Sequence, residues 1–289
     1  MRQHDRSYFF GEPGCEILVK EWGALDKPVL FLVHGFPGCS EHGKLVSTSP
    51  LWESFRLIAV DRPGYGESVV QKNLTFLKFA KQIKSLLKNQ NIDKFSIISV
   101  SGGAPYALAV AYLMKDQVIK LTSVGGIAPV TFGNFKHLNR VQKKTWFAQY
   151  FIPRRVLQFG LDRVWARGLD KLEEAMFTES FSEPDRKVFM HPEIQPVLIE
   201  TTQLALKQGP AGVIHDIRIF GRNWGFPLGE ITCPVTLWHG GVDDVVHIRF
   251  AQDMLGYLPT AKLNFVKEEG HYSILLNCRD RILTDLLAV

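Results

Sequence analysis

The chain of 289 residues has 46% hydrophobic and 22% charged residues, which is the composition of a globular protein and excludes a disordered or collagen-like chain. Its 34 basic residues exceed its 29 acidic residues by five, too small an excess for the phosphate neutralisation that a nucleic-acid-binding protein needs. Nucleic acid is therefore not an expected partner. The length allows one large domain, or a core domain that carries a sizeable insertion.

The cysteine spacing and the length of the apolar stretches indicate the cellular compartment in which we expect the protein. The four cysteines lie far apart, with neither a CxxC pair nor zinc-ligand spacing, so we expect reduced thiols, no metal and no cofactor. No apolar stretch typical of a signal peptide follows the charged N-terminal residues, and the longest apolar run, residues 106–114, is about half of what a membrane span requires. The sequence predicts a cytoplasmic protein with no membrane span.

In chain order, short apolar runs alternate with helical patterns. Helices are expected at residues 74–90 and 105–114. Strands are expected at residues 16–22, 28–33, 56–60, 95–100, 121–124, 235–238 and 263–266. Because such alternation produces parallel strands joined by crossover helices, we predict an α/β fold with a doubly wound, mostly parallel sheet.

The strand pattern stops between residues 124 and 235. Within that gap, residues 131–229 carry aromatic and aliphatic residues at helical spacing, interrupted by prolines. We predict a helical cap, or lid, at 131–229 on a core of residues 1–130 and 230–289. The first part of this segment is rich in Lys and Arg, including Arg154, Arg155 and Arg167. A basic lid would suit an anionic, amphipathic or interfacial substrate, and a solvated outer helix face explains the same residues.

A serine follows the strand expected at residues 95–100. There the chain runs into Ser101-Gly102-Gly103 and then into a helix. A serine at so tight a turn has a strained backbone and a hydroxyl that stands clear of the sheet, an arrangement called a nucleophile elbow. The usual pattern is G-x-S-x-G, and here Ser99 replaces the first glycine. The alternative is a polar turn in which Ser101 only caps the helix.

An acid and a histidine follow later strands. The order serine, acid, histidine is that of a hydrolase triad, and loops after parallel strands meet at one edge of the sheet. His271 is the candidate base that takes the proton of Ser101. Asp243 is the candidate that fixes the tautomer of His271 and offsets its charge, with the neighbouring Asp244 as the rival.

Two backbone N–H groups are expected to form the oxyanion hole, which stabilises the negative charge of a tetrahedral intermediate. Gly102 directly follows the nucleophile and supplies one of them. Phe36, in the glycine-rich loop after the strand 28–33, supplies the other. Pro37 has no N–H, so the donor cannot lie one residue further along.

Together these motifs resemble the α/β-hydrolase family over nearly the whole chain. The resemblance is carried by residues 34–38 (HGFPG), 61–68 (DRPGYGES), 99–108 (SVSGGAPYAL), 239–243 (HGGVD) and 270–271 (GH). It implies an eight-stranded sheet and a helical cap after the sixth strand, which agrees with the segment 131–229. We interpret residues 61–68 as a scaffolding turn in which Asp61 bonds to amides of its own loop.

The resemblance also implies a reaction. Family members that cleave epoxides or haloalkanes attack with an aspartate, so Ser101 indicates a serine hydrolase that cleaves a carboxylic ester or a related acyl compound, such as a thioester or lactone, through an acyl-enzyme. The alternatives are a C–C bond hydrolase, an aminopeptidase that uses the Glu173-Glu174 pair to hold an amine, a ligand receptor, or a cofactor-free lyase or oxygenase. The expected partner is a small acyl molecule, and the sequence does not indicate an oligomeric state.

Overall fold

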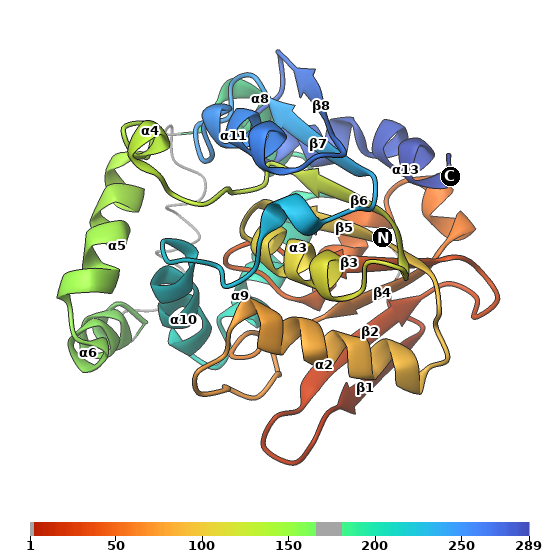
Figure 1. Ribbon diagram of the computed structural model, residues 1–289, viewed down its shortest axis with the longest axis horizontal. Helices are drawn as coiled ribbons and strands as arrows, with labels where there is room; N and C mark the ends of the chain where they lie inside the picture. The colour runs from red at the N-terminus through yellow and green to blue at the C-terminus, as the bar shows by residue number, and fades with distance from the viewer. Residues whose placement is uncertain (1–2, 166–180, 289) are drawn as a thin grey trace.

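The computed structural model describes residues 3–165 and 181–288. Its centre is an eight-stranded sheet in the order β1-β2-β4-β3-β5-β6-β7-β8 (Figure 1). The β1–β2 and β2–β4 pairs are antiparallel and the other pairs are parallel, which confirms the mostly parallel α/β sheet. In chain order the strands are β1 (Arg6–Phe10), β2 (Ile17–Trp22), β3 (Val29–Val33), β4 (Arg56–Val60), β5 (Phe95–Val100), β6 (Val118–Val124), β7 (Val235–Gly240) and β8 (Ala261–Val266).

Helices connect these strands and cover both faces of the sheet (Figure 1). The α2 helix begins at Phe76, two residues after the expected start, because the hydroxyl of Thr75 accepts a hydrogen bond from the N–H of Lys78 at 3.1 Å and caps the helix. In chain order the helices are α1 (Gly43–Val46), α2 (Phe76–Asn89), α3 (Ala104–Leu113), α4 (Phe132–Phe135), α5 (Arg140–Phe151), α6 (Arg154–Trp165), α8 (Glu183–Phe189), α9 (Gln195–Ala205), α10 (Ala211–Phe220), α11 (Arg249–Tyr257), α12 (Ser273–Asn277) and α13 (Arg279–Leu287).

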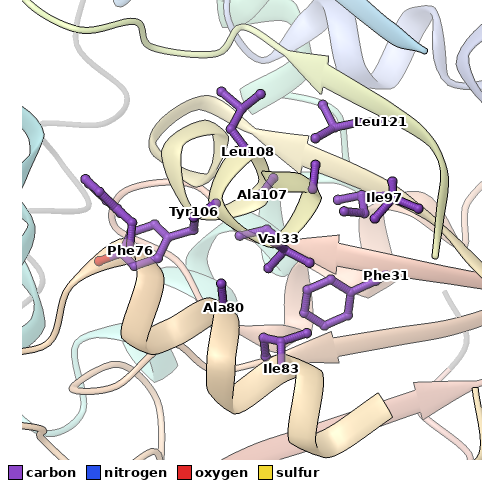
Figure 2. Close-up of a cluster of buried hydrophobic side chains, with 14 of the residues drawn as sticks. Phe31, Val33, Phe76, Ala80, Ile83, Ile97, Tyr106, Ala107, Leu108 and Leu121 are labelled. Atoms are coloured by element: carbon purple, nitrogen blue, oxygen red, sulfur yellow. The ribbon is translucent and has the colours of Figure 1, made fainter. Parts of the chain in front are cut away.

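The sheet is buried on both faces, as the continuous apolar run of β3 predicts. Side chains alternate along a strand, so Phe31 and Val33 pack against α2 and α3, beside Ile83 (Figure 2). Leu30 and Leu32 face the opposite side, where they join apolar side chains of α12 and α13. Helices on both faces of a parallel sheet make the fold doubly wound.

The chain between β6 and β7 forms the helices α4, α5, α6, α8, α9 and α10 in its described part. The α5 and α6 helices lie at one side of the molecule, and α10 lies between them and the core (Figure 1). The division into a core and a cap of residues 131–229 stays a prediction. Arg167 and the Glu173-Glu174 pair lie outside the described residues. Within residues 3–165 and 181–288, we find no helix that is both long and apolar enough to cross a membrane.

Candidate active site

Ser101 lies where β5 ends and the chain turns into α3. Its φ of +49° is in the left-handed region, which residues other than glycine rarely adopt. The turn leaves no room at Gly103, where a Cβ would lie 2.5 Å from the Val33 carbonyl oxygen. Ser99 occupies a regular strand position paired with Val33, so its place in the turn does not require a glycine.

Asp243 and His271 form a buried pair at the same edge of the sheet. The loop after β7 carries Asp243, the loop after β8 carries His271, and Asp243 Oδ2 lies 2.8 Å from His271 Nδ1. Asp243 Oδ1 accepts hydrogen bonds from the N–H groups of Val245 at 2.9 Å and Val246 at 2.7 Å, which fix the carboxylate. Asp244 is exposed to solvent. The structure thus brings Asp243, rather than its neighbour, to the histidine.

The two groups shift each other's protonation. Burial alone would lower the pKa of His271, but the charge and hydrogen bond of Asp243 raise this pKa above its usual value. Burial alone would raise the pKa of Asp243, but His271 lowers it below the usual range. The carboxylate therefore stays ionised and stabilises a proton on the imidazole.

Phe36 and Gly102 lie side by side next to Ser101. A Cβ on Gly102 would lie 2.7 Å from the Cβ of Phe36, and both residues line a cavity together with Ser101. The loop after β3 and the turn after β5 therefore lie side by side at the same cavity. That their N–H groups donate hydrogen bonds to an oxyanion stays a prediction.

Two cavities meet at Ser101. The first, here called the α5 cavity, has a volume of about 150 Å³ and is lined by Ser101 and Gly102 together with residues of α5 and α10. The second, here called the α9 cavity, has a volume of about 250 Å³ and is lined by Ser101 and His271 together with residues of α9 and α12. Ser101 thus lines both cavities.

Among the described residues, neither the lining of the α5 cavity nor that of the α9 cavity includes Lys, Arg, Asp or Glu. The basic residues Arg154 and Arg155 of α6 are instead exposed to solvent. These two arginines therefore lie on a solvated outer helix face, which is the second explanation given above for the basic segment.

The known sequences that resemble this chain include an esterase and a synthase. A family model described as the alpha/beta hydrolase fold matches residues 28–162. A bifunctional esterase/perhydrolase from Acinetobacter calcoaceticus is 29% identical over 245 residues, which cover 83% of each chain. A 2-succinyl-6-hydroxy-2,4-cyclohexadiene-1-carboxylate synthase from Serratia proteamaculans is 30% identical over 91 residues, which cover 31% of this chain and 34% of that protein.

Solved structures share the fold at low sequence identity. A carboxylesterase from Nitrososphaera gargenis superposes with a TM-score of 0.72 at 17% identity, covering 97% of this chain and 98% of the other. An esterase from Exiguobacterium antarcticum superposes with a TM-score of 0.71 at 19% identity, covering 98% of each. The chain therefore has the α/β-hydrolase fold.

One buried acid of this α/β-hydrolase-fold protein, Asp185, lies outside every motif identified in the sequence. Asp185 of α8 accepts hydrogen bonds from three consecutive backbone N–H groups, those of His271 at 2.8 Å, Tyr272 at 2.9 Å and Ser273 at 2.8 Å. These groups lie where α12 begins, and a helix start leaves N–H groups without partners. Asp185 therefore fixes the backbone that carries His271.

Arg62 connects the loops on both sides of Ser101. Its guanidinium donates to the carbonyl oxygens of His34 at 2.8 Å, Gly35 at 3.1 Å and Gly102 at 3.3 Å. It also forms a buried ion pair with Asp216 of α10 at 2.7 Å. The motif that contains Arg62 thus holds the backbone around the site and contributes no catalytic group.

Asp61 stabilises the turn at residues 61–68 by bonding to an amide of its own loop, as the sequence predicts, and to one amide outside it. Asp61 accepts a hydrogen bond from the N–H of Glu67 at 2.9 Å and one from the N–H of Ser40 at 2.6 Å. Gly66 allows this because a Cβ there would overlap with the Asp61 carboxylate.

Proposed function

We propose that this α/β hydrolase is a serine esterase, cleaving a carboxylic ester or a related acyl compound such as a thioester or lactone. The main support is that Ser101, on a strained turn, lines the same cavity as His271, which forms a buried pair with Asp243. A serine hydroxyl is a poor nucleophile at neutral pH, so it requires a base held in one tautomer.

In the proposed reaction, His271 Nε2 takes the proton of Ser101 Oγ while this oxygen attacks the carbonyl carbon of the substrate. The carbonyl oxygen becomes an oxyanion that accepts hydrogen bonds from the N–H groups of Phe36 and Gly102. His271 then returns its proton to the leaving alkoxide, and an acyl group remains on Ser101. Water, activated by the same histidine, hydrolyses the acyl-enzyme.

The two cavities receive different halves of the substrate in this proposal. The leaving group takes its proton from His271, and His271 lines the α9 cavity but not the α5 cavity. The alcohol part therefore occupies the α9 cavity, and the acyl chain occupies the α5 cavity. A cavity of about 150 Å³ holds a molecule the size of benzene, so the α5 cavity suits an acyl chain of about six carbons.

The relatives and the lining support an ester over the alternatives. The relative that covers most of this chain is named an esterase/perhydrolase, whereas the synthase matches about a third of it. An aminopeptidase needs a carboxylate that holds the free amine of its substrate. The described residues that line the two cavities offer none, and the Glu173-Glu174 pair lies outside the described part.

The test is hydrolysis of 4-nitrophenyl esters from acetate to decanoate by the wild type and by Ser101→Ala. We expect kcat/KM to rise toward hexanoate, to fall for longer chains, and to drop by about 10⁴-fold or more in the variant. A fluorophosphonate should add its mass to Ser101 in the wild type only. Turnover that survives in a folded Ser101→Ala variant, or no turnover of any ester by the wild type, would disprove the proposal.

A further inference from the structure

One side chain of the α5 cavity is polar, buried and without a partner. Gln149 of α5 is 1% exposed and lines the cavity that contains Ser101. Within the described chain, neither its amide nitrogen nor its amide oxygen has a hydrogen-bond partner. Burying an unpaired amide is unfavourable, and buried polar groups in folded proteins are nearly always hydrogen-bonded. An amide that is unpaired at both atoms and lines the cavity of Ser101 is therefore a candidate to bind a ligand.

The other amide and hydroxyl groups that α5 contributes to this cavity are already paired. Gln142 donates to the carbonyl oxygen of Val245 at 2.6 Å and accepts from the N–H of Asn139 at 3.0 Å. Thr145 donates to the carbonyl oxygen of Gln142 at 2.9 Å. These two side chains stabilise α5 itself, so the unpaired amide of Gln149 is not a general property of this helix.

A second unpaired donor lies next to Gln149. The indole N–H of Trp146 is buried, has no partner among the described residues, and belongs to a ring that lines the same cavity. Gly221, at the end of α10, leaves room for both side chains. A Cβ at Gly221 would overlap with the amide nitrogen of Gln149 and lie 2.8 Å from Trp146 Cδ1. The amide of Gln149 therefore occupies a position that is available only because residue 221 has no side chain.

We infer that Gln149 and Trp146 form a subsite for a neutral oxygen on the acyl chain of the substrate, an inference that rests on the proposed function. Their N–H groups donate to a ketone or hydroxyl oxygen, and the Gln149 carbonyl accepts from a hydroxyl. The oxygen is neutral because the described lining of the cavity holds no cationic side chain that would offset a buried carboxylate. The substrate class is thus an ester of a short oxo or hydroxy acid.

Matched pairs of 4-nitrophenyl esters test this subsite: 4-oxopentanoate with pentanoate, and 5-oxohexanoate with hexanoate. Oxo esters are used because hydroxy esters of these lengths cyclise to lactones. The measured quantity is the kcat/KM ratio of the oxo ester to its hydrocarbon partner. We expect the wild type to prefer one of the oxo esters by about tenfold or more, because the hydrocarbon ester lacks the oxygen and leaves the polar groups of the site unpaired.

Three variants assign the preference to the subsite. In Gln149→Met, which keeps the length of the side chain without its amide, the ratio should fall toward one. Gly221→Ala should lower the ratio in the same direction, since its methyl occupies the space of the amide. Gln158→Met is the matched control, because it makes the same substitution on α6 at an amide that pairs with Asp162 and does not line the cavity, and the ratio should keep its wild-type value.

The possible outcomes separate this inference from the proposed function. Equal rates on oxo and hydrocarbon esters in the wild type, with turnover abolished by Ser101→Ala, would overturn the inference alone. A preference that survives in both Gln149→Met and Gly221→Ala would also overturn it, because the oxygen then binds elsewhere. A wild type that hydrolyses none of the esters would overturn the proposed function and the inference with it.

Discussion

At the scale of single residues, the charge of Asp243 sets the pH range in which His271 works as a base. The histidine must be neutral to accept the proton of Ser101, so activity rises as the pH passes upward through its pKa. Burial lowers this pKa and the carboxylate at 2.8 Å raises it, with a net rise. The acid limb of the pH profile should therefore lie above the usual histidine value of about 6.5.

Asp243→Asn removes the negative charge that raises the pKa of His271. The pKa then falls, so the acid limb of kcat/KM for 4-nitrophenyl hexanoate should move to lower pH. The rate at pH 8 should fall by about 10⁴-fold, because the amide favours the wrong tautomer of the imidazole. Asp244→Asn is the control and should move neither quantity, since Asp244 is exposed. An acid limb that stays in place in Asp243→Asn would contradict the pairing.

Residues that act through a local motif were accessible from the sequence, whereas residues that act through packing were not. Ser101 and His271 each follow an apolar strand, and this position is readable along the chain. Gln149 has no such signal, because a glutamine on a helix is usually solvated. Its importance depends on the space that Gly221 leaves open and on the partners that are missing around it.

At the scale of elements, α8 determines where the loop after β8 can lie. Asp185 accepts hydrogen bonds from three N–H groups of the residues that lead into α12. Oδ2 accepts one of these bonds and Oδ1 accepts two. A negative charge at a helix start is favourable, because the helix dipole is positive there. The charge of Asp185 also raises the pKa of His271, although burial and Asp243 affect that pKa more strongly.

Asp185→Asn keeps the shape of this contact but loses its charge and one of its two acceptor oxygens. We expect a loss of about 1–3 kcal/mol in the free energy of unfolding, measured by urea denaturation. The acid limb of the kcat/KM profile should also move to lower pH, because one charge that raises the pKa of His271 is gone. Stability lost without a shift of the limb would show that Asp185 is only structural.

The control for this variant lies on the same helix. Glu183 is exposed and pairs with Lys187 on the surface of α8. Glu183→Gln should therefore leave both the urea midpoint and the acid limb where they are in the wild type.

Element boundaries were predictable where burial is continuous along a strand. The fully buried β3 and β4 strands match the expected runs to within one residue. The β1 strand was not predicted, because it lies at the edge of the sheet and its residues alternate between half-buried and exposed. The β6 strand begins earlier than expected, at Val118, because Lys120 interrupts the apolar pattern after Ile119.

At the scale of the whole molecule, the Arg62–Asp216 pair joins the helices between β6 and β7 to the sheet. Asp216 of α10 is fully buried and accepts hydrogen bonds from Arg62 and from the hydroxyl groups of Tyr65 and Tyr106. Arg62 belongs to a motif that the sequence identifies. Its partner lies more than a hundred residues away and becomes identifiable only when α10 packs against the core.

Asp216→Asn tests how strongly this pair fixes the site. The variant leaves the guanidinium of Arg62 buried without its counter-charge, and breaking a buried pair in this way costs about 3–5 kcal/mol. We expect a loss of that size in urea denaturation at pH 7. The kcat/KM for 4-nitrophenyl hexanoate should fall as well, since Arg62 holds the carbonyl groups of His34, Gly35 and Gly102 beside the proposed oxyanion donors.

The exposed pair of Lys115 and Glu230 is the matched control for this experiment, because it also spans distant parts of the chain. Glu230→Gln should leave the urea midpoint unchanged, as solvent screens such a pair. If Asp216→Asn unfolded at the same urea concentration as the wild type, the buried charge pair would not be what fixes α10 to the core. The apolar contacts of Phe220 with Phe36 and Phe76 would then carry that role, and Phe220→Ala would be the destabilising change.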